Sequence, residues 1–432
     1  MKKNNTYSIP IFAFGMLWVI VSFILIMLPV QTRFSNMFDI TFVNIIFVIL
    51  VSGTALFWIQ NVPRICLIST KLKNMSIKKI KFIWSFSFYS SCFGLLLVAY
   101  DRIFVRGIDY SLGVRNARYQ WLELGDVGSI YGKIGNLMIP FSYCILFISV
   151  FHWEIMEKQK RIIGVCTGIG VQIGFAMLIG GRSNILIVIV FLIVSCFLRK
   201  GRGKTFLPPI KMKIILGIGF GYFVFQYCIS IFYAFSDNSI SYLSQTVFYL
   251  GANIEGWYYE YVNPLVNTLI NILVYMFHGS FYTGAVLSNM PESVSINQNI
   301  SLRGIWSVLD RLNLIDYQME LPNFDSGSGA FVAVPGILLY DYGYIGFIIA
   351  SLLIGILLGI ALNEIRSRKG QLGIIKLIFC IVVLMHIFLS PVTMALGIGY
   401  FTFMIFALFF MEVISGIIYG FSNWTEVNIS SK

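Results

Sequence analysis

Apolar runs long enough to cross a bilayer, separated by short basic clusters, make up most of this sequence. Hydrophobic residues account for 58% of the 432 residues and charged residues for 12%, whereas soluble domains carry about 25% charged residues. A run of about 20 apolar residues has the length that crosses a bilayer as an α-helix. We therefore predict an all-α, polytopic membrane protein, which excludes soluble enzymes, secreted domains and nucleic-acid-binding proteins.

Ten of these runs are predicted to span the membrane, near residues 9–30, 38–60, 82–100, 130–152, 162–180, 184–198, 213–233, 336–361, 372–390 and 396–420. The longest connection, 234–335, follows the seventh run and is expected to carry interfacial helices, among them an amphipathic one over 302–315. The chain is thus expected to divide into helices 1 to 7 (1–233), an extracytoplasmic loop (234–335), and helices 8 to 10 with a cytoplasmic tail (336–432).

The distribution of basic residues predicts how the chain is oriented. Of the 31 Lys and Arg residues, 22 lie in segments on the same side as the amino terminus. By the positive-inside rule, both termini are then cytoplasmic. The net charge of +12 follows from this topology, and it favours contact with anionic lipids of the inner leaflet.

Arginine predominates among the basic residues on the opposite, outer side. Only one lysine is predicted there, together with eight arginines: Arg33, Arg102, Arg106, Arg115, Arg118, Arg182, Arg303 and Arg311. Guanidinium groups bind phosphate and carboxylate in a planar, bidentate way and keep their charge when partly desolvated. This pattern predicts an outer anion-binding site; the alternative is that the arginines pair with outer carboxylates.

Arg182 lies in a Gly-Gly-Arg-Ser turn at 180–183 between two predicted spans. A turn this short keeps the arginine at the membrane boundary, where an ionised group needs a partner. The glycines let backbone N–H groups approach a ligand, and the following helix presents its positive end. The turn therefore suits a pyrophosphate at headgroup depth, with a snorkelling arginine as the alternative.

Arg115 and Arg118 are three residues apart, so they share a face if 114–119 is helical. Trp121 nearby is expected to hold this helix at the interface or to provide a flat surface for a sugar ring. A solvated basic face is the alternative interpretation.

The candidates for a general base are His278 and Glu255, both in the long outer segment. Glu260, Asp325 and Asp341 compete for this role, but a structural hydrogen bond at a helix break is the preferred interpretation for Asp341. The sequence contains no metal-ligand spacing and no phosphate-binding loop, so we expect neither a metal ion nor a nucleotide cofactor.

In four features the chain resembles the O-antigen polymerases, also called oligosaccharide repeat-unit polymerases. These features are the number of spans, the long outer segment before the eighth span, the turn at 180–183, and the Tyr-Asp-Tyr-Gly-Tyr-Ile-Gly sequence at 340–346. The resemblance implies a metal-independent glycosyltransferase with a GT-C-like fold in the bacterial cytoplasmic membrane. Its substrate would be an oligosaccharide linked to undecaprenyl pyrophosphate, and a flippase and a chain-length regulator would be candidate partners.

By the same resemblance, Arg182 would bind pyrophosphate, and Arg118 and Arg303 would correspond to outer-loop arginines that bind the lipid-linked substrates. O-antigen ligases share this architecture but usually carry a histidine shortly before the eighth span, where 325–331 has none. A ligase, a more distantly similar peptidoglycan glycosyltransferase, a polysaccharide transporter or flippase, and a non-catalytic scaffold remain the alternatives.

Overall fold

The structure is a computed structural model. It describes residues 8–28, 30–32, 37–61, 77–111, 113–124, 129–180, 183–201, 204–206, 252–254, 270, 273–274, 277, 279–281, 283–284, 286–288, 299–311, 314–315, 332–366 and 374–429. The described residues form helices and their connections, together with one short antiparallel pair of β-strands. In it β1 (Val30–Thr32) runs beside β2 (Ala252–Ile254), with Val30 opposite Ile254.

Eight helices in the described residues are long and apolar enough to cross a membrane: Ile9–Met27, Met37–Asn61, Lys78–Val105, Ile130–Phe151, Lys158–Ile179, Asn184–Gly201, Val334–Ile365 and Gly399–Ile418. They coincide with eight of the ten predicted spans and confirm a multi-pass helical membrane protein. The predicted span over 372–390 forms a helix whose apolar part, Lys376–Leu389, is shorter. The predicted span over 213–233 lies outside the described residues.

The chain divides into two compact units, each built from segments distant in sequence. The first unit comprises Met1–Ile65, Leu207–Asn363 and Val383–Gly399, and the second comprises Cys66–Phe206, Glu364–Val382 and Tyr400–Lys432. The division into 1–233, 234–335 and 336–432 concerns membrane topology, and it stays a prediction.

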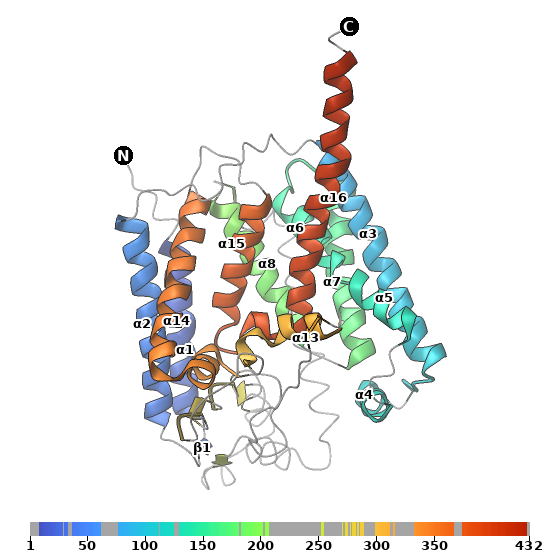
Figure 1. Ribbon diagram of the computed structural model, residues 1–432. Helices are drawn as coiled ribbons and strands as arrows, with labels where there is room; N and C mark the ends of the chain where they lie inside the picture. Colours follow the sequence, from blue (N-terminus) through green and yellow to red (C-terminus); the bar gives the residue numbers. More distant parts are fainter. Residues whose placement is uncertain are drawn as a thin grey trace. The chain divides into compact units, whose positions relative to one another are not determined.

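Two helices of the first unit, α1 (Ser8–Met27) and α2 (Met37–Asn61), pack against each other (Figure 1). Glycines let α14 (Val334–Arg366) approach α2. A Cβ atom at Gly355 would lie 2.7 Å from the carbonyl oxygen of Val51, and one at Gly359 would lie 2.7 Å from Cβ of Trp58. Small residues at such contacts are typical of helix packing in membranes.

The second unit surrounds α6 (Phe141–Phe151), whose residues are all buried. Around it pack α3 (Ile77–Tyr100), α7 (Lys158–Ile179) and α8 (Ser183–Gly201) (Figure 1). Pro140 precedes α6 and separates it from α5 (Ile130–Met138), so the predicted fourth span consists of two helices.

Candidate functional site

The structure describes only part of the predicted site. Arg182, His278 and Glu255 lie outside the described residues, and so does the side chain of Arg115. Arg118 belongs to the second unit and Arg303 to the first. That Arg118, Arg182 and Arg303 form one site therefore stays a prediction.

Arg118 lies on α4 (Val114–Glu123), so the segment 114–119 is helical. Its Nη1 donates a hydrogen bond to the carbonyl oxygen of Gly180, at 3.0 Å. Gly180 has φ of 62° and ends α7, and a Cβ atom there would lie 2.7 Å from Cβ of Arg118. Only glycine fits both this backbone conformation and this contact. An arginine 62 positions earlier in the chain thus rests against the first residue of the Gly-Gly-Arg-Ser turn.

Tyr110 connects the loop before α4 to the same end of α7. Its hydroxyl donates a hydrogen bond to the carbonyl oxygen of Leu178 at 2.5 Å. Burial raises the pKa of the Tyr110 hydroxyl, although nearby Arg102 opposes the shift, so the phenol stays protonated and can donate. The loop is also held at Asp109, whose backbone N–H donates to Oε1 of Gln120 at 3.0 Å. The ends of α4 and α7 therefore form one connected structure.

A buried charged cluster lies where α3 continues into the π-helix η2 (Asp101–Val105). The Asp101 side chain is 1% exposed, and its Oδ2 lies 3.0 Å from Nε of Arg106. Its Oδ1 accepts a hydrogen bond from the hydroxyl of Ser129, which also caps α5. A Cβ atom at Gly132 would lie 2.7 Å from Oδ2 of Asp101, so the absence of a side chain there leaves room for the carboxylate.

Arg102 is the most unusual member of this cluster. It is 5% exposed, and its guanidinium carbon lies 4.4 Å from the ring centroid of Trp121, a cation–π contact. Its Nε is 3.9 Å from Oδ2 of Asp101, too far for a hydrogen bond. Among the described residues, neither Nε nor Nη1 of Arg102 has a hydrogen-bond partner. The cluster therefore places two guanidinium groups beside one carboxylate.

Sequence reasoning counted Arg102 and Arg106 among the outer arginines but did not select them as site residues. Two signals pointed to them. An Asp-Arg pair ends an apolar run at 101–102, and the two arginines are four residues apart, which places them on one helix face. Trp121 packs on the Arg102 guanidinium, and its expected role at the interface or under a sugar ring stays a prediction.

In the first unit, Asp341 holds the segment that carries Arg303. Its Oδ1 and Oδ2 accept hydrogen bonds from the backbone N–H groups of Ile300 at 3.0 Å and Ser301 at 2.8 Å. Arg303 begins the next helix, α13 (Arg303–Arg311), which forms within the predicted amphipathic segment. The interpretation of Asp341 as a structural acceptor at a helix break is confirmed, since the break occurs at Gly343 (φ 66°, ψ −172°).

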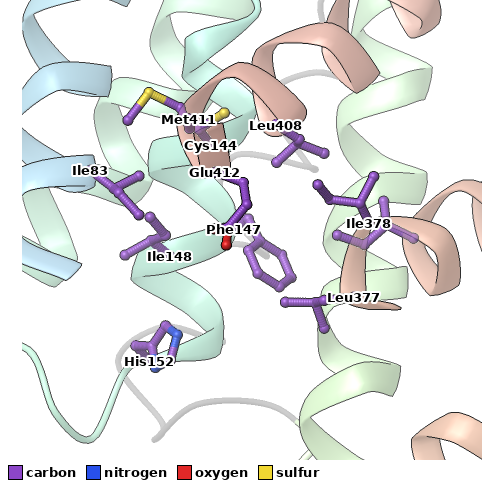
Figure 2. A pocket seen from close by; sticks show the side chains of 11 residues that line it. Ile83, Cys144, Phe147, Ile148, His152, Leu377, Ile378, Leu408, Met411 and Glu412 are labelled. Atoms are coloured by element: carbon purple, nitrogen blue, oxygen red, sulfur yellow. The ribbon is translucent and has the colours of Figure 1, made fainter. Parts of the chain in front are cut away.

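The second unit also contains a partly open apolar pocket of about 40 Å³. Figure 2 shows the carboxylate of Glu412 beside Phe147 and Ile148, with His152 below them. Glu412 pairs with Lys79 at 3.0 Å, and both side chains are almost buried. No group of three or more metal-ligating side chains occurs among the described residues. The pocket is thus apolar around one paired carboxylate, and it does not resemble a substrate site for a sugar.

Comparisons with protein-family models, with curated proteins and with solved structures give no match to this chain.

Proposed function

We propose that this protein is a membrane glycosyltransferase that polymerises oligosaccharide repeat units linked to undecaprenyl pyrophosphate. It would act on the outer face of a bacterial cytoplasmic membrane, without a metal ion or nucleotide. The observation that carries the proposal is the contact between Arg118 and Gly180, which brings an arginine of α4 to the turn containing Arg182. Arg102 and Arg106 add two further guanidinium groups in the same unit.

An excess of guanidinium groups suits the chemistry of this reaction. Cleaving a sugar–pyrophosphate bond builds negative charge on the leaving phosphate, and positioned cations stabilise that charge. The energy for the transfer resides in the donor bond itself. The lipid tail holds the pyrophosphate at headgroup depth, the depth expected for arginines at the ends of membrane helices.

The second chemical requirement is a base for the acceptor hydroxyl, which contributes roughly 10²–10⁴-fold to rate. His278 and Glu255 are the two candidates, and both lie in the outer segment that follows the predicted seventh span. Arg303 on α13 would bind the lipid-linked substrate from the first unit.

The direct test uses purified protein in detergent or nanodiscs with a synthetic repeat unit on undecaprenyl pyrophosphate. We expect a ladder of lengthened products in the presence of a chelator and in the absence of nucleotide. Transport of the lipid-linked unit across a vesicle membrane without lengthening would instead identify a transporter. Transfer onto an unrelated acceptor, without a ladder, would identify a ligase.

Substitution of Arg182 tests the site itself. Arg182→Ala should reduce polymer formation by about 10²-fold or more at normal protein levels, because one charge-stabilising donor is lost at the leaving group. Arg182→Lys should restore little, because lysine cannot make a bidentate contact. Full-length polymer with Arg182→Ala would remove this residue from the mechanism, and full rescue by lysine would show that charge alone matters.

A further inference from the structure

We infer that Arg102 and Trp121 line a binding pocket for a phosphate group carried by a lipid, on the predicted outer side of the second unit. The sequence predicts a pyrophosphate site around Arg182, with Arg102 only one of eight outer arginines and Trp121 an interface anchor or a surface for a sugar ring. The inference deepens the proposed function by naming further residues that contact a lipid phosphate. The phosphate-binding step does not itself require transferase activity.

Among the described residues this cluster holds two arginines and one carboxylate, so it carries one net positive charge. Asp101 is engaged by Arg106 at 3.0 Å and by the hydroxyl of Ser129, whereas Nε of Arg102 lies 3.9 Å away. Burying a charge without a hydrogen-bonded partner is costly, so a buried guanidinium implies an acceptor. One monoanion beside Arg102 would supply that acceptor and neutralise the cluster.

Arg102 is buried in the fold and is not a mobile side chain on the surface. Trp121 covers the guanidinium at 4.4 Å, and the Arg102 side chain is 6% exposed. Within the part of the chain that the structure describes, Nε and Nη1 of Arg102 have no hydrogen-bond acceptor.

The depth of the site selects the kind of anion. Arg102 belongs to the last turns of the apolar helix Lys78–Val105, which is long enough to cross a bilayer. The ends of such helices lie in the headgroup region, where the phosphates of membrane lipids are found. A phosphate on a lipid reaches this depth readily, whether its carrier is a polyprenyl donor or an anionic phospholipid.

The test measures lipid binding to the full-length protein in neutral nanodiscs of phosphatidylcholine. Undecaprenyl phosphate and phosphatidylglycerol are titrated separately, with inorganic phosphate as the lipid-free probe. Wild-type protein should bind at least one of the two anionic lipids, and Arg102→Gln should weaken that binding by about 10- to 100-fold because a charge-assisted hydrogen bond is lost. Tighter binding of undecaprenyl phosphate would assign the pocket to the donor lipid, and tighter binding of phosphatidylglycerol would assign it to a phospholipid.

Matched controls come from the same chain. Arg161 lies 4.9 Å from the ring centroid of Trp153 between the fourth and fifth predicted spans, so Arg161→Gln removes a similar contact elsewhere. This control should bind as wild type does. Trp121→Leu keeps the Arg102 guanidinium but removes the aromatic ring packed against it, so lipid affinity should fall severalfold. Trp153→Leu should not change lipid affinity. These variants keep the test informative if Arg102→Gln does not fold.

Equal affinity of wild type and Arg102→Gln for both lipids would overturn the inference. Wild-type binding of inorganic phosphate alone would overturn the lipid part of it. If the lipid binds through Arg102 but no ladder of polymer forms, the polymerase proposal fails while the phosphate pocket stands. If a ladder forms and Arg102 does not affect lipid binding, the polymerase proposal stands and the pocket fails.

Discussion

Arg199 lies in the last turn of the apolar helix α8 and is a fully buried cation. Its hydrogen-bond and ion-pair partners show how the fold accommodates a buried charge. Nη1 donates to the carbonyl oxygen of Val150 at 2.7 Å, and Nη2 lies 2.5 Å from Oε1 of Glu154. Lys204 contacts the other carboxylate oxygen at 3.0 Å. Partial burial raises the pKa of Glu154, but hydrogen bonds from Arg199 and Lys204 outweigh this effect and hold the pKa below its ordinary value.

This arrangement makes stability depend on pH. The pKa of Glu154 is lower in the folded state than in the unfolded state. The ionised carboxylate therefore contributes its full stabilisation at pH values above the ordinary glutamate pKa. This stabilisation is lost as the pH falls through the lowered pKa of the folded state. Glu154 is 47% exposed, so Glu154→Gln should cost only ~1 kcal/mol at pH 7 and less at acidic pH. Thermal unfolding of both proteins between pH 7 and pH 4 measures the difference.

Glu157→Gln is the control, because that carboxylate is 55% exposed and pairs with Lys81 and Lys160 at the surface. Glu157→Gln should change the midpoint of thermal unfolding less than Glu154→Gln does at every pH. A gap between wild type and Glu154→Gln that stays constant down to pH 4 would contradict the assignment.

Among the elements, α13 depends on a contact that is distant in sequence. Asp341 supplies one oxygen to each of two backbone N–H groups, and the hydroxyl of Tyr342 lies 2.9 Å from Oγ of Ser301. The next residue, Gly343, has a backbone conformation essentially restricted to glycine. The break in α14 therefore directly follows the two residues that hold the 3₁₀-helix η4 (Ile300–Leu302), which leads into α13.

Substitutions at this contact should loosen α13 without unfolding the helices. Asp341→Asn removes a charged acceptor worth about 1.5–3 kcal/mol, so amide hydrogen exchange at 300–311 should accelerate by about 10- to 100-fold. Tyr342→Phe should have a smaller effect in the same direction. The control is Tyr344→Phe, because Tyr344 is 60% exposed and should not alter exchange in this segment. Unchanged exchange in Asp341→Asn would show that other contacts hold α13.

Across the whole molecule, the distribution of charge predicts the orientation in the membrane. Ser111, in the loop before α4, is predicted to be outside, and Lys158, at the start of α7, is predicted to be inside; both are exposed. In a variant without the seven native cysteines, a membrane-impermeant maleimide should label Ser111→Cys in intact cells. Lys158→Cys should be labelled only after permeabilisation. The reverse pattern would place the arginine cluster on the cytoplasmic side and contradict the proposed function.

The sequence by itself determined the helices, because the length of an apolar run is a local property and a bilayer imposes that length directly. It also predicted the structural role of Asp341. Only the tertiary structure decided which side chains meet. Asp101 is held by Ser129 and Arg106, Arg118 reaches Gly180, and Trp121 covers Arg102. Such pairs depend on how separate helices pack, and helix periodicity contains no information about that packing.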